Sequence, residues 1–121
     1  MTENLSKGSE KTPSVDISGS DILITGRSYP EDLHAFWDDI VSNLENKIQN
    51  CEVNKLIFDV SYHNSGTTRI FVNLLKFIEA ADAVDDFEVI WRFDEEDEQT
   101  EEQGEDYQLF CKKASFKLES Y

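Results

Sequence analysis

The chain has 121 residues, a length that suits one domain and is short for two. Its 26 acidic residues outnumber 11 basic ones and give a net charge of −15, which repels phosphate backbones and anionic lipid headgroups. With 39% hydrophobic residues, a polar amino-terminal stretch and no long apolar run, the chain is expected to be a soluble, cytoplasmic protein that binds neither nucleic acid nor membranes directly.

The amino-terminal part of the chain predicts a tail followed by a hairpin. Residues 1–12 have no periodic apolar pattern, so we expect a flexible tail there and a single domain over residues 13–121. Val15 and Ile17 alternate with polar residues, and a second apolar run, Ile22 to Ile24, follows the turn residues 18–21. This pattern is typical of two antiparallel strands.

A first helix is predicted after residue 30. Ser28 and Glu31 have the spacing of a capping box, and Pro30 suits a first helical turn. The apolar residues then recur at steps of three and four, which predicts an amphipathic helix of about 18 residues. The residues of this stripe are Leu33, Phe36, Trp37, Ile40, Val41, Leu44 and Ile48.

A central strand, a second helix and another strand follow. Residues 55–62 alternate, with Leu56, Phe58, Val60 and Tyr62 on one face, and Ile57 on the other face predicts a strand covered on both sides. Residues 87–93 alternate in the same way and predict the next strand. The helix between them is predicted from a stripe that contains Ile70, Phe71, Leu74, Leu75, Ile78 and Ala81.

The segment from Asp94 to Asp106 contains nine acidic residues and no basic one. A solvated loop is the favoured interpretation, and an acidic docking surface or a metal site are the alternatives, although the spacing does not fit an EF-hand. A short helix through Tyr107, Leu109 and Phe110 and a last strand around residues 116–118 complete the order β-β-α-β-α-β-α-β. This order predicts a single α/β domain with a mixed, mostly parallel sheet.

The turn at residues 63–68 follows the central strand and opens a helix, a position where ligand and partner sites concentrate in α/β sheets. Its three hydroxyl residues, Ser65, Thr67 and Thr68, allow two interpretations. One of them caps the helix, or one of them is phosphorylated, because a phosphate at a helix amino terminus meets unpaired N–H groups. Arg69 favours the second interpretation, since a nearby dianion would suit it.

Other residues predict no chemistry of their own. His34 is expected on a helix surface and His63 as an ordinary turn residue, and Trp37 and Trp91 are expected in the core. The two cysteines, Cys51 and Cys111, form no motif and are expected to be intracellular thiols.

Several segments resemble the SiaC family of bacterial biofilm-regulation phosphoproteins, which are related in fold to the STAS domains of anti-sigma factor antagonists. The likeness runs from about Thr12 to Leu118, and its most specific parts are the Ser-Tyr-Pro-Glu and Trp-x-x-Asp-Glu-x-Asp-Glu elements. The matching segments are Thr12-Pro13, Gly26 to Glu31, Tyr62 to Arg69, Val89 to Glu98 and Gly104 to Tyr107.

The resemblance implies a STAS-like domain that acts as a partner switch without catalytic residues or cofactors. A dedicated serine/threonine protein kinase would phosphorylate Ser65, a PP2C-type phosphatase would reverse this, and the unphosphorylated form would bind and activate a diguanylate cyclase. Ser65 stands at the family's phosphoacceptor position, and Thr67 is a second possible acceptor. The expected partner-binding residues are Tyr62, Asn64, Thr67, Thr68 and Arg69.

Two other functions stay open on the sequence alone. The chain could be an anti-sigma factor antagonist that acts on an anti-sigma kinase, because that switch uses the same fold and the same helix terminus. Less favoured is a metal-dependent enzyme that uses the acidic segment 94–106 and His63.

Overall fold

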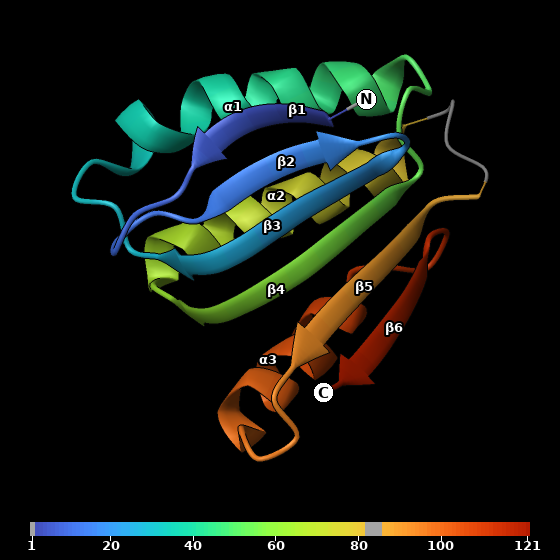
Figure 1. The fold of residues 1–121 in the computed structure, drawn as a ribbon. Helices are drawn as coiled ribbons and strands as arrows, with labels where there is room; N and C mark the ends of the chain where they lie inside the picture. The colour runs from blue at the N-terminus through green and yellow to red at the C-terminus, as the bar shows by residue number, and fades with distance from the viewer. Residues whose placement is uncertain (1, 82–85) are drawn as a thin grey trace.

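The computed structural model describes residues 2–81 and 86–121. These residues form one six-stranded sheet and three helices (Figure 1). The strands are β1 (Thr2–Lys7), β2 (Ser14–Ser18), β3 (Asp21–Ser28), β4 (Lys55–His63), β5 (Glu88–Phe93) and β6 (Ser115–Ser120). The helices are α1 (Leu33–Gln49), α2 (Ser65–Ala80) and α3 (Glu98–Gln108).

The strands lie in the sheet in their order along the chain, β1-β2-β3-β4-β5-β6. The first three strands pair antiparallel and the last four pair parallel. The predicted mixed, mostly parallel α/β sheet is therefore confirmed, as are the hairpin of β2 and β3 and the later strands β4, β5 and β6. The element order differs only by an additional strand at the amino terminus.

The prediction of a flexible tail is wrong for residues 2–7, because they form β1. This edge strand pairs with β2 from Thr2 to Lys7, so the sheet extends beyond the predicted boundary at residue 13. Polar contacts add to the backbone pairing: Asn4 Nδ2 donates to Asp16 Oδ1 at 2.6 Å, and Lys47 Nζ of α1 lies 3.3 Å from Glu3 Oε2. A strand held in this way needs no apolar alternation, so its sequence does not show it.

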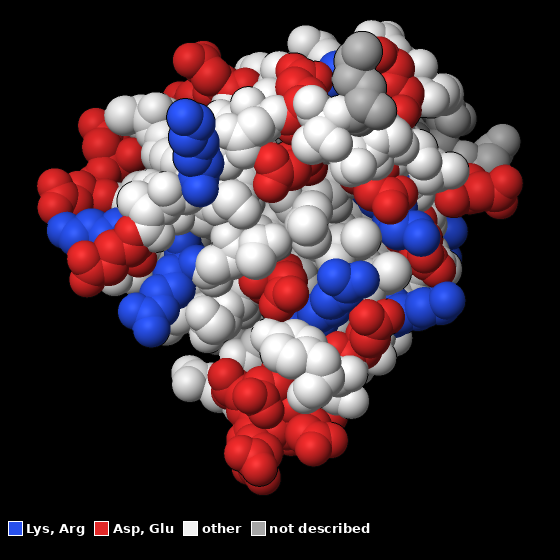
Figure 2. All heavy atoms as spheres, viewed as in Figure 1, with Lys and Arg blue, Asp and Glu red and all other residues white. Residues whose placement is uncertain are grey.

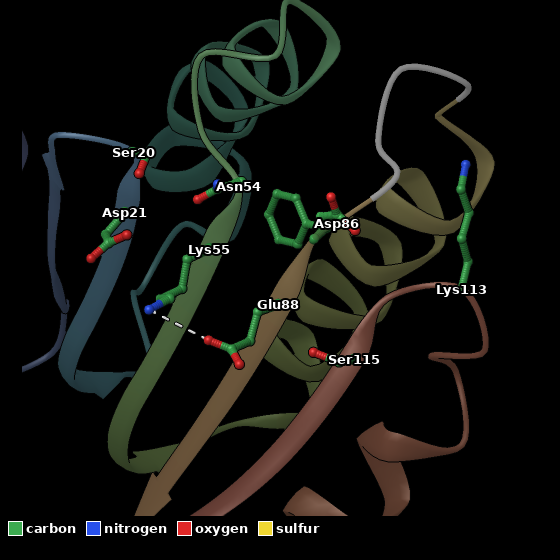
Figure 3. Close-up of a pocket in the computed structure, with 9 residues that line it drawn as sticks. Ser20, Asp21, Asn54, Lys55, Asp86, Glu88, Lys113 and Ser115 are labelled. Atoms are coloured by element: carbon green, nitrogen blue, oxygen red, sulfur yellow. Dashed lines mark ion pairs between the residues drawn. The ribbon is translucent and has the colours of Figure 1, made fainter.

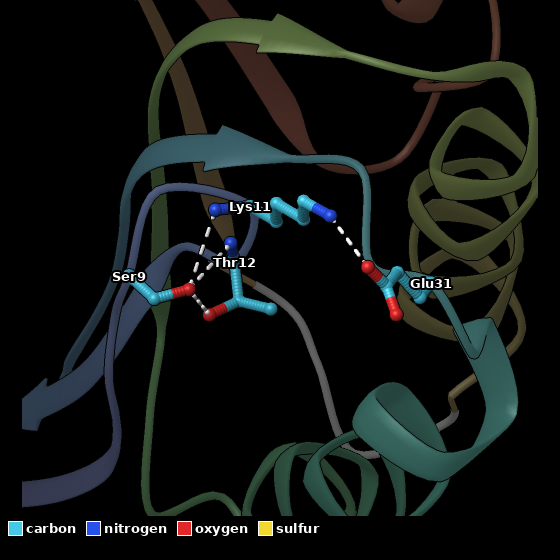
Figure 4. Close-up of polar contacts among 4 residues, drawn as sticks. All are labelled: Ser9, Lys11, Thr12 and Glu31. Carbon is cyan, nitrogen blue, oxygen red and sulfur yellow. Dashed lines mark hydrogen bonds and ion pairs between the residues drawn. The ribbon is translucent and has the colours of Figure 1, made fainter.

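The loop after β1 lies against the segment that precedes α1. The Lys11 carbonyl accepts a hydrogen bond from the Tyr29 N–H at 2.7 Å, and Lys11 Nζ lies 2.5 Å from Glu31 Oε1 (Figure 4). The predicted capping box is wrong, because α1 begins at Leu33 and Asp32 accepts the hydrogen bond from Ala35 N at 3.0 Å. Glu31 therefore forms an ion pair with Lys11 in place of a capping contact, and Ser28 bonds other side chains, Thr67 and Trp37.

The three helices pack on one face of the sheet, as successive right-handed crossovers in one direction require. Their apolar stripes join the inward-facing strand residues in one core, in which Ile24, Phe58 and Trp91 occupy one row across β3, β4 and β5. In Figure 1 the sheet is seen from its other side, with α2 running behind β3 and β4.

Ile57 predicted that β4 would be covered on both faces of the sheet. On the face opposite the helices, the structure shows ion pairs between neighbouring strands. Ile57 and Ile90 are buried on this face but lie outside the core cluster. Glu88 bridges Lys55 at 3.4 Å and Lys117 at 3.1 Å, which links β4, β5 and β6. Figure 2 shows basic side chains among acidic ones over this face, while acidic residues gather at the end that holds α3.

Most of the acidic segment is helical, so its interpretation as a loop is wrong for residues 98–106. Asp97 caps α3 by accepting hydrogen bonds from Thr100 N at 3.0 Å and from Thr100 Oγ1 at 2.8 Å. Glu98 and Glu101 lie in the first turn, where the helix dipole favours negative charge. The helix thus begins earlier than predicted and ends before Leu109, which is exposed.

Candidate functional site

A bulge in β4 sets the residues that face outward where this strand ends. Gly26 pairs with Val60 while Arg27 pairs with Tyr62, so Ser61 is an extra residue in β4. An extra residue exchanges the two faces of the residues that follow. Tyr62, predicted to face inward with Val60, is 54% exposed, and His63, predicted as an ordinary turn residue, is only 6% exposed.

The first turn of α2 presents Ser65 to solvent. Asn64 caps the helix, its Oδ1 accepting a hydrogen bond from Thr67 N at 2.9 Å, so the interpretation that a hydroxyl residue caps α2 is wrong. Ser65 is the first helical residue and is exposed. Among the described residues its hydroxyl has no hydrogen-bond partner, so this hydroxyl is accessible at the positive end of the helix dipole.

Thr67 does not lie on this surface. Its side chain is fully buried, with Oγ1 2.8 Å from Ser28 Oγ and 3.2 Å from the Ser28 carbonyl oxygen. Trp37 Nε1 donates to the same Ser28 Oγ at 3.3 Å. The predictions that Thr67 is a second phosphoacceptor and a partner contact therefore conflict with its burial, whereas the core positions of Trp37 and Trp91 are confirmed.

The other predicted partner residues surround Ser65. Thr68 is half-buried and its Oγ1 donates to the Asn64 carbonyl oxygen at 3.3 Å, while Arg69, one turn after Ser65, is exposed. Tyr62 packs edge-on against Tyr29, with ring centroids 5.6 Å apart. The set brought together at the start of α2, which we call the turn surface, is Tyr62, Asn64, Ser65, Thr68 and Arg69.

His63 and Tyr107 join the end of β4 to α3, a contact that the sequence does not predict. His63 Nε2 lies 2.7 Å from Tyr107 Oη. Burial lowers the pKa of His63 to about 4 and raises that of Tyr107 to about 12, so both side chains are neutral at pH 7. His63 Nδ1 is buried and has no hydrogen-bond partner among the described residues.

A pocket of about 380 Å³ separates the turn surface from the first turns of α3. Ser65, Asn64 and His63 line one side, and Asp97, Thr100 and Gln103 line the other. The pocket therefore brings Ser65 and Asp97, a residue of the acidic segment, to the same cavity. This neighbour of the turn is not apparent from the sequence, because Asp97 lies 32 positions after Ser65.

A larger pocket, of about 650 Å³, lies at the opposite end of the sheet, around the amino ends of β4 and β5. Three of its charged side chains are engaged within the protein: Lys55 pairs with Glu88 (Figure 3), and Lys113 Nζ donates to the Ala81 carbonyl oxygen at 2.8 Å. The polar groups of this pocket thus contribute to holding the strands together.

The described residues contain neither a metal-binding cluster nor a membrane-spanning helix. Within residues 2–81 and 86–121, no group of three or more His, Cys, Asp or Glu side chains is arranged to hold a metal ion. In the same ranges, no helix has both the length and the apolar character that crossing a membrane requires.

Comparison with known proteins gives a family and a set of similar folds. A family model described as SiaC family regulatory phosphoprotein matches residues 6–121. Among curated proteins, none matches the chain. One similar solved structure is the diguanylate cyclase SiaD in complex with its activator SiaC from Pseudomonas aeruginosa, with a TM-score of 0.83, 18% identity and coverage of 98% of this chain and 99% of that chain.

Two further structures of SiaC from Pseudomonas aeruginosa are also similar. The apo form has a TM-score of 0.77 and the other structure one of 0.79, each at 16% identity over 98% of this chain and 99% of that chain. At this identity the likeness establishes the fold over nearly the full length of both chains.

Proposed function

This chain belongs to the SiaC family of regulatory phosphoproteins, and from this premise we propose that it is a non-catalytic partner switch controlled by phosphorylation of Ser65. In the unphosphorylated form it binds and activates a diguanylate cyclase in the cytoplasm, in the way that SiaC of Pseudomonas aeruginosa is the activator of the cyclase SiaD. A serine/threonine protein kinase adds the phosphate and a PP2C-type phosphatase removes it.

The accessibility of the Ser65 hydroxyl supports this proposal most directly. Ser65 is exposed on the first turn of α2, and the helix does not need its hydroxyl because Asn64 is the cap. The buried Thr67 hydroxyl, by contrast, is engaged with Ser28. A kinase could therefore modify Ser65 without opening the core, whereas modification of Thr67 would require α2 to unpack.

A phosphate on Ser65 would change the turn surface without unfolding the protein. It adds a charge of about −2 beside the backbone N–H groups at the start of α2. Arg69, one helical turn away and exposed, offers a second stabilising group. A partner that docks on Tyr62 and its neighbours in the unmodified protein would then meet a bulky dianion on an already acidic molecule and lose affinity.

The first test is the phosphorylation state of the protein isolated from its own cells, measured by intact mass and by mapping of the modified residue. We expect a single phosphate on Ser65. Absence of phosphate under several growth conditions, or a phosphate at a residue outside the turn surface, would contradict the proposal.

The second test measures the effect on cyclase activity. We expect the purified protein to raise cyclic di-GMP synthesis by a diguanylate cyclase from the same cells, Ser65→Ala to do so constitutively, and Ser65→Asp to fail. Ser18→Asp is the matched control, because Ser18 is exposed at the opposite end of the sheet. The switch is refuted at this residue if the Ala and Asp variants both activate the cyclase like the wild type.

A further inference from the structure

Helix α3 is attached to the sheet by a narrow stripe of residues. Its buried residues are Thr100, Gly104 and Tyr107, whereas α1 and α2 bury four and five residues, most of them large and apolar. The remaining positions of α3 are half-buried or exposed and are mostly acidic. Since tertiary packing provides most of a helix's stability in a protein, α3 is the helix that a small perturbation would release first.

Three specific contacts hold this stripe in place. Trp91 Nε1 donates to the Thr100 carbonyl oxygen at 2.9 Å, and Tyr107 Oη lies 2.7 Å from His63 Nε2. Gly104 lets the helix backbone lie directly on Trp91 and Leu118, since a Cβ at this position would be 2.6 Å from Leu118 Cδ2. His63, which makes one of these three contacts, lies in the chain between Tyr62 and Asn64 of the turn surface.

The amino-terminal part of α3 faces the site of modification. Ser65 lies across the pocket from Asp97, Gln99, Thr100 and Gln103, which belong to the cap and first turns of α3. Asp97 is the one acidic residue among those that line this pocket, and the segment around it, residues 94–106, contains nine acidic residues and no basic one. A dianion introduced on Ser65 would therefore repel the nearest part of α3, and within a pocket that repulsion is less screened than on an open surface.

We propose that phosphorylation of Ser65 loosens α3 from the sheet, so that the phosphate changes the shape of the partner surface as well as its charge. This inference rests on the proposed modification of Ser65 and extends its effect to a second element. Release of α3 removes the wall of the pocket that holds Asp97 and uncovers Trp91 and His63, the two residues that α3 contacts through Thr100 and Tyr107. The surface recognised by a partner of the unmodified protein is then composed of both the turn surface and α3, and the modified protein lacks half of it.

Hydrogen exchange of backbone amides tests this directly in the full chain. The protein is prepared with phosphoserine installed at position 65 during translation, so the test does not depend on whether any cellular kinase modifies this residue. Exchange across α3 is expected to be about tenfold faster or more than in the unmodified protein, with exchange in α1 unchanged. The matched control has phosphoserine at position 18, at the opposite end of the sheet, and should leave α3 unchanged.

A charge-neutralised variant separates repulsion from other causes. The triple variant Glu98→Gln, Glu101→Gln, Glu102→Gln removes three negative charges from α3 and leaves its cap, Asp97, intact. Because Glu98 and Glu101 also favour the helix dipole, the reference is the same triple variant without phosphoserine, and phosphoserine 65 is expected to accelerate α3 exchange less in this variant than in the wild-type chain. The inference is overturned if phosphoserine 65 leaves α3 exchange unchanged, if α1 and α3 accelerate alike, or if phosphoserine 18 has the same effect.

The proposed function and this inference fail in different experiments. If cells place no phosphate on Ser65, the proposed function fails whatever α3 does in the installed form. If Ser65 is phosphorylated and controls cyclase activation while α3 exchange stays unchanged, the switch acts through the turn surface alone.

Discussion

Ser28 Oγ lies 2.8 Å from Thr67 Oγ1, and this contact joins the end of β3 to the first turn of α2 in the core. The Thr67 hydroxyl has one proton, which it donates to the Ser28 carbonyl oxygen. The Ser28 hydroxyl must therefore donate to Thr67 Oγ1 while it accepts from Trp37 Nε1. Each hydrogen bond among these three buried side chains therefore has one possible donor. These bonds fix the first turn of α2, which carries the exposed Ser65, to the core.

We expect Thr67→Val to destabilise the protein by about 1–3 kcal/mol, because it leaves the buried Ser28 hydroxyl without an acceptor at nearly constant volume. Urea unfolding monitored by tryptophan fluorescence measures the change. Thr68→Val is the comparison variant, since Thr68 is half-buried and its side chain bonds the Asn64 carbonyl oxygen and Tyr107 without touching the Ser28 hydroxyl. Equal stability of the two variants would mean that the Ser28–Thr67 contact contributes little.

We expect Gly104→Ala to destabilise the protein by about 1–3 kcal/mol through overpacking against Trp91 and Leu118. Helix propensity alone predicts the opposite sign, a gain of about 1 kcal/mol. Gly66→Ala serves as the control in α2, because its new Cβ would lie 3.2 Å from Leu33 Cδ2, at the end of a flexible side chain, and at an ordinary contact distance of 3.7 Å from Asn64 Oδ1. Thermal unfolding of both variants decides between packing and propensity, and a stabilised Gly104→Ala protein would contradict the close packing of α3.

Burial of His63 makes stability depend on pH in a defined window. Its pKa falls from 6.5 to about 4 on folding, so the unfolded chain binds the extra proton and stability decreases as the pH drops from 6.5 toward 4. Over this pH range, protonation of His63 in the unfolded chain lowers the free energy of unfolding by on the order of 3 kcal/mol. His63→Gln should remove that component, which is measured as the difference between the two proteins' stabilities at pH 7 and pH 4.5. A pH-independent difference would contradict a buried, neutral His63.

Glu79 fixes the segment between α3 and β6 by accepting backbone hydrogen bonds from Lys112, Lys113 and Ala114 at 2.8–3.1 Å. Burial raises the pKa of this carboxyl, but the backbone hydrogen bonds outweigh it and the net pKa lies below its ordinary value. The stabilisation is thus present above the unfolded pKa and is lost as the pH falls through the folded one.

Glu79→Gln should cost about 1–3 kcal/mol at pH 7, because one charged acceptor oxygen is replaced by an NH₂ group that faces backbone donors. Glu105→Gln, on the exposed side of α3, is the control and should change stability little. Urea titrations at pH 7 and pH 3 measure both variants. The assignment would be wrong if the Glu79 deficit stayed undiminished at pH 3.

The elements that the sequence predicts well are those whose burial is periodic. The stripes of α1 and α2 and the alternation in β4 and β5 each report one buried face, and the structure confirms all four elements. β1 escapes prediction because backbone pairing and polar contacts such as Asn4 to Asp16 hold it. The beginning of α3 is not predicted because this helix is stabilised by the Asp97 cap and by contacts of Thr100, Gly104 and Tyr107. The acidic residues between them show no apolar stripe.

The candidate site is predictable in position but only partly in detail. The sequence indicates Ser65 because this residue follows a central strand and opens a helix, and its exposure agrees with that expectation. The burial of Thr67 depends on Ser28, 39 positions earlier, and the role of His63 depends on Tyr107, 44 positions later. The bulge at Ser61 also reverses the faces of Tyr62 and His63. A single extra residue in a strand cannot be recognised from the alternation of apolar residues in the sequence.

Because the order of strands in the sheet is their order along the chain, each strand completes a pairing with the strand made just before it. The sheet can therefore grow from one side as the polypeptide leaves the ribosome, without waiting for a distant segment to insert between strands already formed. β6, the last strand to emerge, closes the growing edge together with α3. An interrupted synthesis would thus produce a shorter sheet of the same topology, with its unfinished edge exposed to aggregation.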